Sequence, residues 1–385
     1  MPSDVAASPL LGRLRLARRP APRAVAAWLF VICAMLLVMI VLGGATRLTG
    51  SGLSIMEWAP LMGTLPPLSE TEWRRLYALY QQIPQYSLVN QGFGIEGFKG
   101  IFWLEWAHRL WGRLIGIAFL LPLIWFAVRG AIDGRLARRL GLLFLLGGLQ
   151  GAIGWFMVAS GFAVDSTTVS PYRLVVHLTM ALVLYSVILW TALGLWRDGA
   201  AIPAQTAASP PALRRLSVAV LHLVALTVVA GGFVAGLHAG LTYNTFPLMS
   251  GRLVPEGYWA LPGLRNLTEN IPAVQFDHRL LATGTALLAL GTAAYGLRAG
   301  VSGVLRTRLL LLGSAVLAQY ALGVSTLMWV VPVSLGTAHQ AMAVLLLTAA
   351  LALLHAQPRA AASRNTQSSP VDRLGRTRAH DALTR

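Results

Sequence analysis

Residues 102–116 read FWLEWAHRLWGRLIG and place a histidine, His108, at the start of a long apolar run. Glu105 precedes this histidine by three positions, and residues three apart are neighbours on one face of a helix. Ionisable residues inside an apolar, membrane-like helix are costly, so an acid and an imidazole placed there indicate a functional site. Residues 275–281, QFDHRLL, repeat the His-Arg pair at His278. The chain therefore carries two similar helices with polar starts.

The composition is that of an integral membrane protein. The 385 residues are 56% hydrophobic and only 12% charged. Apolar stretches of about 18 residues or more are typical of membrane-spanning helices. The sequence predicts eight of them, near residues 25–46, 103–128, 140–160, 172–196, 215–237, 276–297, 309–331 and 333–355. We expect an all-α integral membrane protein with eight transmembrane helices.

The strongly basic charge follows the membrane topology. The formal net charge is +17, and most of the 31 basic residues fall within 13–23, 129–139, 197–215, 298–308 and 359–385. These segments all lie on one side of the predicted membrane. By the positive-inside rule that side, and both chain termini with it, is cytoplasmic. The charge therefore indicates orientation in a lipid bilayer and does not indicate a nucleic-acid partner.

Two similar halves make up the predicted chain. We expect a basic cytoplasmic N-terminus at 1–23, a first four-helix half at 24–197, a linker at 198–212, a second four-helix half at 213–356 and a polar, disordered cytoplasmic tail at 357–385. The Ala/Pro-rich composition of the linker and the Ser/Arg-rich composition of the tail carry this division. The one cysteine, Cys33, excludes an intramolecular disulfide.

The halves are related by an internal repeat. Gly43-Gly44 opens the segment GGATRLTGSGLSIMEWAPLMG, and Gly231-Gly232 opens GGFVAGLHAGLTYNTFPLMSG. Each segment is followed by a His-Arg helix and then by one further histidine, His177 in the first half and His339 in the second. With four helices in each half, both copies enter the membrane from the same side, as in parallel repeats. We therefore predict two pseudo-symmetric four-helix bundles.

The four repeated histidines suit a flat ligand. Each half has two of them on different helices, and the helix rise places all four within roughly 10 Å of the outer surface. Imidazole is the common axial ligand of haem iron, and bundle cores hold cofactors between facing helices. Arg109 and Arg279 would face the outer surface, where guanidinium groups pair with propionates. A zinc site is a weaker interpretation, because it needs three or four close ligands.

Several polar residues also fit roles outside a cofactor site. A membrane-embedded histidine often hydrogen-bonds to a backbone carbonyl at a helix interface. We favour this for His222 and His355, which have no counterpart in the other half. His238, at the outer end of the fifth helix, is interpreted as facing a loop. The arginines that follow the repeated histidines also fit snorkelling towards lipid headgroups.

The halves differ at one position that bears on function. Glu105 precedes the first histidine by three, whereas Gln275 stands in the same place in the second half. One interpretation is an electron-transfer cytochrome with two structural b-type haems. The other is one resident haem in the second half and a reactive site in the first, where Glu105 accepts a proton or stabilises positive charge. A repeat-built transporter is a third class, but its polar residues usually lie at the membrane midplane.

Several longer phrases resemble the haem A synthase family, Cox15/CtaA. They are GGATRLTGSGLSI (43–55), GFKGIFWLEWAHRLWGR (97–113), PYRLVVHL (171–178), GLTYNTFPLM (240–249), FDHRL (276–280) and GTAHQ (336–340). The resemblance covers nearly the whole chain. It implies an oxidoreductase of the inner membrane that oxidises the C8 methyl group of haem O, through an alcohol, to the formyl group of haem A for cytochrome oxidase.

The same resemblance implies the site residues. A resident haem b would be ligated by His278 and His339, and substrate haem O would lie at His108 and His177, with Glu105 needed for turnover. Haem O synthase, a membrane redox partner and a second copy of the chain are candidate partners. Some family members carry a cysteine pair in the first outer loop, which this sequence lacks, so a thiol role there is excluded.

Overall fold

The computed structural model describes residues 21–59, 62–199 and 210–357. Within these ranges the chain forms helices and no β-strand, and eight of the helices are long and apolar enough to cross a membrane. The predicted all-α multi-pass membrane fold is therefore confirmed. Most of the predicted N-terminal segment 1–23, linker 198–212 and tail 357–385 lies outside the described residues.

The eight long helices follow the predicted apolar segments in order. They are α1 (Pro22–Leu48), α4 (Ile95–Val128), α5 (Gly134–Val158), α6 (Pro171–Asp198), α7 (Leu213–Gly236), α9 (Ile271–Arg298), α10 (Gly303–Met328) and α11 (Val333–Ala356). Proline occupies the first turn of α1, α6 and α9, where its missing N–H costs no helical hydrogen bond. Asp133 caps α5 by accepting a hydrogen bond from the Leu136 N–H at 2.7 Å.

Helix α4 begins eight residues before its predicted start. Its first turns are amphipathic: Phe98 and Phe102 are buried, while Lys99 and Glu96 form an ion pair at 2.9 Å on the exposed side. A long apolar run is the signal of a membrane span, and this mixed segment lacks it. His108 therefore lies about three and a half turns inside its helix, not at the helix start as predicted.

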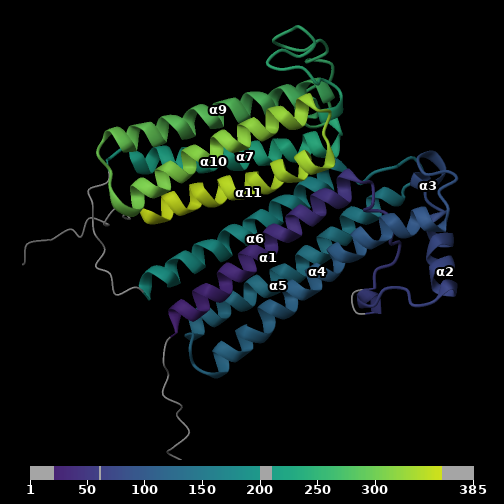
Figure 1. Ribbon diagram of the computed structural model, residues 1–385, viewed down its shortest axis with the longest axis horizontal. Helices are drawn as coiled ribbons and strands as arrows, with labels where there is room; N and C mark the ends of the chain where they lie inside the picture. Colours follow the sequence, from purple (N-terminus) through teal and green to yellow (C-terminus); the bar gives the residue numbers. More distant parts are fainter. Residues whose placement is uncertain (1–20, 60–61, 200–209, 358–385) are drawn as a thin grey trace, which may run out of the picture.

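The long connection between α1 and α4 folds against this extension. It contains α2 (Glu70–Tyr80), capped by the Ser69 side chain, and the short α3 (Pro84–Leu88). Trp73 and Tyr80 of α2 are buried against Phe98 and Leu53. The corresponding connection in the second half contains only short helices, including α8 (Leu264–Thr268). Both connections project from the same end of the long helices (Figure 1).

The long helices fall into two groups of four (Figure 1). In the first group α1 contacts α4, α4 contacts α5, α5 contacts α6, and α6 returns to α1. In the second group α7, α9, α10 and α11 contact one another in the same cyclic order. Between the groups α1 contacts α11, α7 contacts α6, and α6 contacts α11. A two-fold relation between the halves stays a prediction, and this contact pattern favours it.

One hydrophobic core runs through both groups. It includes Leu29 of α1, Tyr185 of α6, Val220 of α7 and Leu347 of α11, all buried. A hydrogen bond also joins the two groups of helices. The Arg47 Nη1 donates to the Ala235 carbonyl at 2.6 Å, which ties the end of α1 to α7. The two halves are therefore packed as one unit.

Candidate functional site

The two histidines of the first half each lie against a glycine of a neighbouring helix. A Cβ atom placed on Gly43 of α1 would lie 3.0 Å from Cε1 of His108 on α4. A Cβ atom on Gly154 of α5 would lie 2.8 Å from Cε1 of His177 on α6. A larger residue at either position would require the imidazole ring to shift, because real Cβ contacts are rarely so short. The helix backbones therefore shape the space that each imidazole occupies.

The second half repeats both contacts. A Cβ atom on Gly231 of α7 would lie 3.0 Å from Cε1 of His278 on α9, and one on Gly323 of α10 would lie 2.8 Å from Cε1 of His339 on α11. In each half the first helix therefore accommodates the histidine of the second, and the third accommodates the histidine of the fourth. The four histidines singled out from the sequence occupy matched places.

A glutamine accompanies the second histidine of each half. The Gln150 Nε2 donates to the His177 backbone carbonyl at 2.9 Å and lies 3.1 Å from the His177 Nδ1. The Gln319 Nε2 lies 3.5 Å from the His339 Nε2. Each glutamine precedes its helix's close-contact glycine by four residues. Sequence reasoning missed both, although the spacing Gln-x-x-x-Gly in the third helix of each half was visible.

Each half contributes two imidazoles from different helices. One ring comes from the second helix of the half and one from the fourth, and both lie against glycines of neighbouring helices. The buried Nδ1 atoms of His108, His278 and His339 lack a well-formed hydrogen bond. Across the described ranges, no group of three or more His, Cys, Asp or Glu side chains could hold a metal ion. Two imidazoles without further ligands suit haem iron better than a zinc ion.

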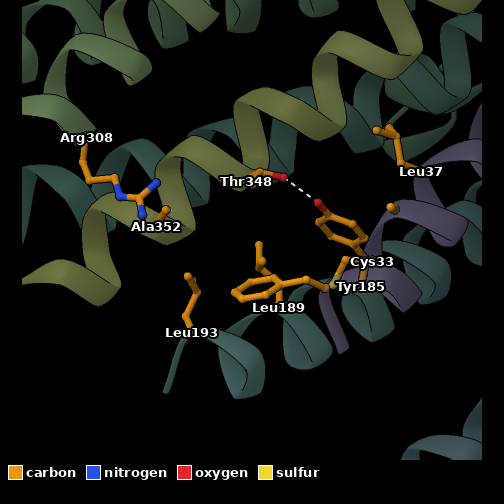
Figure 2. A pocket seen from close by; sticks show the side chains of 10 residues that line it. Cys33, Leu37, Tyr185, Leu189, Leu193, Arg308, Thr348 and Ala352 are labelled. Atoms are coloured by element: carbon orange, nitrogen blue, oxygen red, sulfur yellow. Dashed lines mark hydrogen bonds between the residues drawn. The ribbon is translucent and has the colours of Figure 1, made fainter. Parts of the chain in front are cut away.

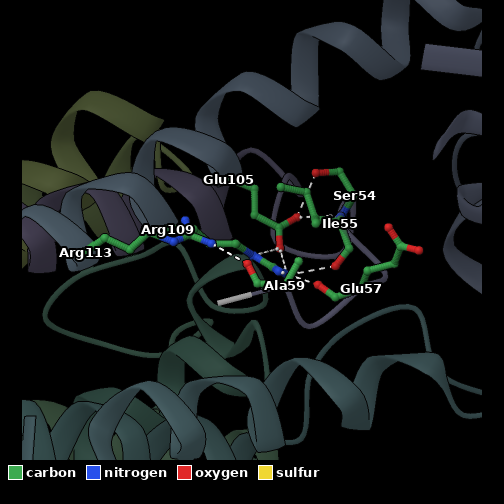
Figure 3. Close-up of polar contacts among 7 residues, drawn as sticks. All are labelled: Ser54, Ile55, Glu57, Ala59, Glu105, Arg109 and Arg113. Atoms are coloured by element: carbon green, nitrogen blue, oxygen red, sulfur yellow. Dashed lines mark hydrogen bonds and ion pairs between the residues drawn. The ribbon is translucent and has the colours of Figure 1, made fainter. Parts of the chain in front are cut away.

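Glu105 is a buried carboxylate that connects the loop after α1 to α4 (Figure 3). Its Oε2 accepts hydrogen bonds from the Ser54 N–H at 2.8 Å, the Ser54 hydroxyl at 2.7 Å and the Ile55 N–H at 3.0 Å. Its Oε1 accepts from the Arg109 Nη2 at 2.7 Å and Nε at 3.1 Å. These five bonds point the carboxylate at the loop and at Arg109 rather than at His108.

Arg109 and Arg279 hold equivalent loop carbonyls. The Arg109 Nη2 donates to the Ile55 carbonyl at 2.7 Å, and its Nη1 to the Glu57 carbonyl at 2.9 Å. The Arg279 Nη2 and Nη1 donate to the Tyr243 and Thr245 carbonyls, each at 2.8 Å. The shift in numbering that superposes the two glycine pairs also superposes these carbonyls. Both arginines therefore shape the loop that follows the first helix of their half.

The Glu/Gln difference between the halves has a local physical reason. Gln275, which is also buried, donates its Nε2 to the Ala239 carbonyl at 2.8 Å and the Tyr243 carbonyl at 3.3 Å. Its Oε1 accepts from the Arg279 Nη2 at 3.2 Å. The loop of the second half thus offers acceptors where the first loop offers donors. A carboxylate fits only the donors, and an amide matches the acceptors.

Glu57 extends the first loop's contacts to α2. Its carboxylate pairs with Arg75 at 2.8 Å, and the same guanidinium pairs with Glu72 at 2.8 Å. Hydrogen bonds from Arg75 lower the pKa of Glu57, and partial burial acts in the opposite direction. The side chains of Arg75 and Glu57 are almost half exposed, so the pair contributes well under about 1 kcal/mol. It orients the loop more than it stabilises the fold.

The remaining histidines have ordinary surroundings. A ring nitrogen of His222 lies 2.8 Å from the Val218 carbonyl of its own helix, and the His355 ring packs edge-on against Trp190. His238 follows α7 with a left-handed backbone, φ 53°. It stands where the repeat has Gly50, which is also left-handed, φ 68°. This position requires a backbone conformation that glycine adopts at the least cost.

Most of the chain matches one protein family. The sequence profile described as "COX15-CtaA: Cytochrome oxidase assembly protein" matches residues 26–351. The chain belongs to this family. The match includes most residues of all eight long helices and both long connections, so the four histidines and the loop contacts of the two arginines lie inside it.

Three proteins that are similar to this chain share the same name. A protein of Granulibacter bethesdensis named Heme A synthase is 65% identical over 332 residues, which cover 86% of this chain and 86% of the relative. A protein of the same name from Rhodospirillum centenum is 49% identical over 345 residues, 89% of this chain and 90% of the relative. The Heme A synthase of Nitrosospira multiformis is 47% identical over 332 residues, 86% and 92% of the two chains.

Proposed function

We propose that this chain is a haem A synthase, an oxidoreductase that converts the C8 methyl group of haem O into the formyl group of haem A for cytochrome oxidase. The observation that carries the proposal is the pair of buried, glycine-backed histidines in each half of a chain from this family. The names of its relatives support the same activity.

In this proposal the second half holds a resident haem and the first half binds the substrate. His278 and His339 would hold a resident haem b, and His108 and His177 would face substrate haem O. When bound, the haem iron supplies the redox chemistry, and the protein supplies binding and orientation. Glycine contacts behind all four rings support the assignment, because they restrict where each imidazole can lie.

Glu105 and the two arginines act in the proposal as positioning residues. The Glu105 carboxylate and the Arg109 guanidinium together hold the loop at Ser54–Glu57 against the helix that carries His108. Arg279 does the same for the second loop. We propose that turnover needs Glu105 because this loop closes the outer side of the first histidine pair. Pairing of Arg109 and Arg279 with haem propionates remains part of the proposal.

The orientation is proposed from charge. Arginine-rich short connections all join helix ends opposite the two long connections, which supports cytoplasmic termini and histidines towards the outer face of the inner membrane. Haem O synthase as the supplier of substrate, a membrane redox partner and a homo-oligomer are the proposed partners.

Haem analysis of a host that makes haem O but no haem A tests the activity. Membranes are extracted with and without expression of the full chain, and the haems are separated by chromatography. We expect haem A and its alcohol precursor only when the chain is expressed. A folded protein that carries only haem b, with haem O unchanged, would contradict the proposal.

That contrary result would favour a diheme electron-transfer cytochrome. The specific observation on its side is the likeness of the two histidine pairs, which have the same glycine contacts and a glutamine in the same place. A carrier would bind two haems of one type and would tolerate loss of Glu105 without loss of haem. The number and types of haem bound by the purified wild type, together with the haem A yield of a Glu105→Gln variant that keeps its resident haem, distinguish the two functions.

A further inference from the structure

A cavity lies at the seam between the halves, away from the histidine pairs. It has a volume of about 320 Å³ and is lined by residues of α1, α6, α10 and α11. Cys33, Leu37, Tyr185 and Leu189 are among them, and of the ten lining residues only Arg308 is charged. Figure 2 shows the Arg308 guanidinium at one end of the lining and Leu37 at the other. The cavity is thus amphipathic along its length.

The apolar part of the cavity has no polar group in need of a ligand. The Tyr185 hydroxyl is hydrogen-bonded to the Thr348 Oγ1 at 2.7 Å. Cys33 and Leu189 are almost fully buried, whereas Ala34, one turn of α1 from Phe30, is exposed. The cavity therefore opens along α1 on the lipid side. Its apolar surroundings suit a hydrocarbon chain, and its volume is near the lower end for ligand pockets.

Arg308 places a positive charge at the other end of the cavity. It lies about 8 Å into α10, on the side of the arginine-rich short connections. In the described part of the chain, no group hydrogen-bonds or ion-pairs with its guanidinium. An arginine at this end of a membrane helix can extend its guanidinium to the level of the lipid headgroups, where an unpaired charge attracts anionic phosphates. Trp196, half exposed and packed edge-on against Phe30, adds an aromatic side chain typical of the membrane interface.

We infer that this cavity binds one anionic phospholipid, with its phosphate on Arg308 and one acyl chain along the seam towards Cys33 and Leu37. Basic pockets between membrane helices on the cytoplasmic side are known to bind anionic headgroups. The bound chain fills the space between α1, α6 and α11, which are three of the four helices through which the halves meet. The lipid stabilises the seam, and its site is independent of the histidine pairs.

The matched control lies on the same helix. Arg306 is exposed and does not line the cavity, so Arg306→Gln removes the same charge from the same membrane surface. Full-length protein, delipidated in an uncharged detergent, is titrated with phosphatidylglycerol or phosphatidylcholine in mixed micelles. Native mass spectrometry counts bound lipid, and thermal unfolding measures the stabilisation.

We expect one tightly bound phosphatidylglycerol per chain and an increase of the unfolding midpoint that phosphatidylcholine does not produce. Arg308→Gln should weaken the phosphatidylglycerol affinity about fivefold, the equivalent of about 1 kcal/mol for one basic side chain, and Arg306→Gln should leave it within about twofold. Ala34→Phe, which narrows the opening but keeps the charge, should also weaken binding.

Three results would overturn the inference. Equal losses in Arg306→Gln and Arg308→Gln would mean that only the general surface charge attracts the lipid. Equal binding of phosphatidylcholine and phosphatidylglycerol would exclude recognition of the phosphate by Arg308. Retention of a neutral isoprenoid quinone in the purified protein, unaffected by Arg308→Gln, would assign the cavity to a different ligand.

Discussion

The buried carboxylate of Glu105 gives a sharp test of how the first loop is held. Glu105→Gln keeps the shape of the side chain but replaces one acceptor oxygen with a donor. If the amide oxygen stays on Ser54 and Ile55, the NH₂ group faces the Arg109 Nε and Nη2; if it turns over, the NH₂ group faces the three loop donors. Either orientation places donors against donors.

The expected loss of unfolding free energy in Glu105→Gln follows from these hydrogen bonds. Hydrogen bonds to charged groups contribute about 1.5–3 kcal/mol each. Breaking a fully buried ion pair costs about 3–5 kcal/mol. The side chain of Arg109 is 20% exposed and keeps its two carbonyl partners, so the lower end applies. We expect Glu105→Gln to lower the free energy of unfolding by about 3 kcal/mol.

The assay is denaturant or thermal unfolding of the full chain in micelles, followed by the fluorescence of its 12 tryptophans. Glu96→Gln is the matched control, because that carboxylate pairs with Lys99 on the same helix but is 81% exposed. It should change the unfolding free energy by no more than about 0.5 kcal/mol. Equal stability of Glu105→Gln and Glu96→Gln would refute the structural role of Glu105. A lost haem A yield with unchanged stability would instead assign Glu105 to the chemistry.

Three further predictions concern the ligands, the glycine contacts and the topology. His278→Ala or His339→Ala should abolish the low-spin haem b spectrum of the purified protein, whereas His108→Ala should keep it. An unchanged spectrum in both His278→Ala and His339→Ala would exclude these two histidines as ligands. Gly154→Ala should displace the His177 imidazole and lower the free energy of unfolding by about 1–3 kcal/mol through overpacking. Gly151→Ala, where an added Cβ would meet open space, should leave the free energy of unfolding unchanged or raise it. The same destabilisation by both substitutions would show that the contact between Gly154 and His177 is unimportant. Reporter fusions should place both chain ends in the cytoplasm, and an external end would overturn the orientation.

The fold was predictable because its signal is local and strong. Unbroken apolar runs gave all eight membrane helices, within a few residues for most of their ends. The start of α4 was missed because Glu96 and Lys99 interrupt the apolar run. The alternation of buried Phe98 and Phe102 with this exposed pair shows why a search for apolar runs overlooks an amphipathic extension.

The candidate site was predictable in part. The histidines stood out because the repeat reproduces them, and the structure places each ring against a glycine of a neighbouring helix. Their assignment as haem ligands stays a prediction. Gln150 and Gln319 were missed, although the repeat contains them too, because a glutamine in an apolar helix has less obvious chemistry than a histidine. The sequence difference between Glu105 and Gln275 was interpreted as a difference in function. Its local reason depends on which backbone groups each loop turns inward, and residue types do not specify that orientation.

The central claim is that this chain oxidises a methyl group of haem O, and the mass of the haem tests it most directly. Membranes from the haem O-producing host, with or without the full chain, are sampled over time, and extracted haem is analysed by mass spectrometry. We predict a species with one added oxygen, followed by one with an added oxygen and two fewer hydrogens, only where the chain is present. Haem O of unchanged mass throughout, in membranes that contain the folded and haem-loaded protein, would contradict the account.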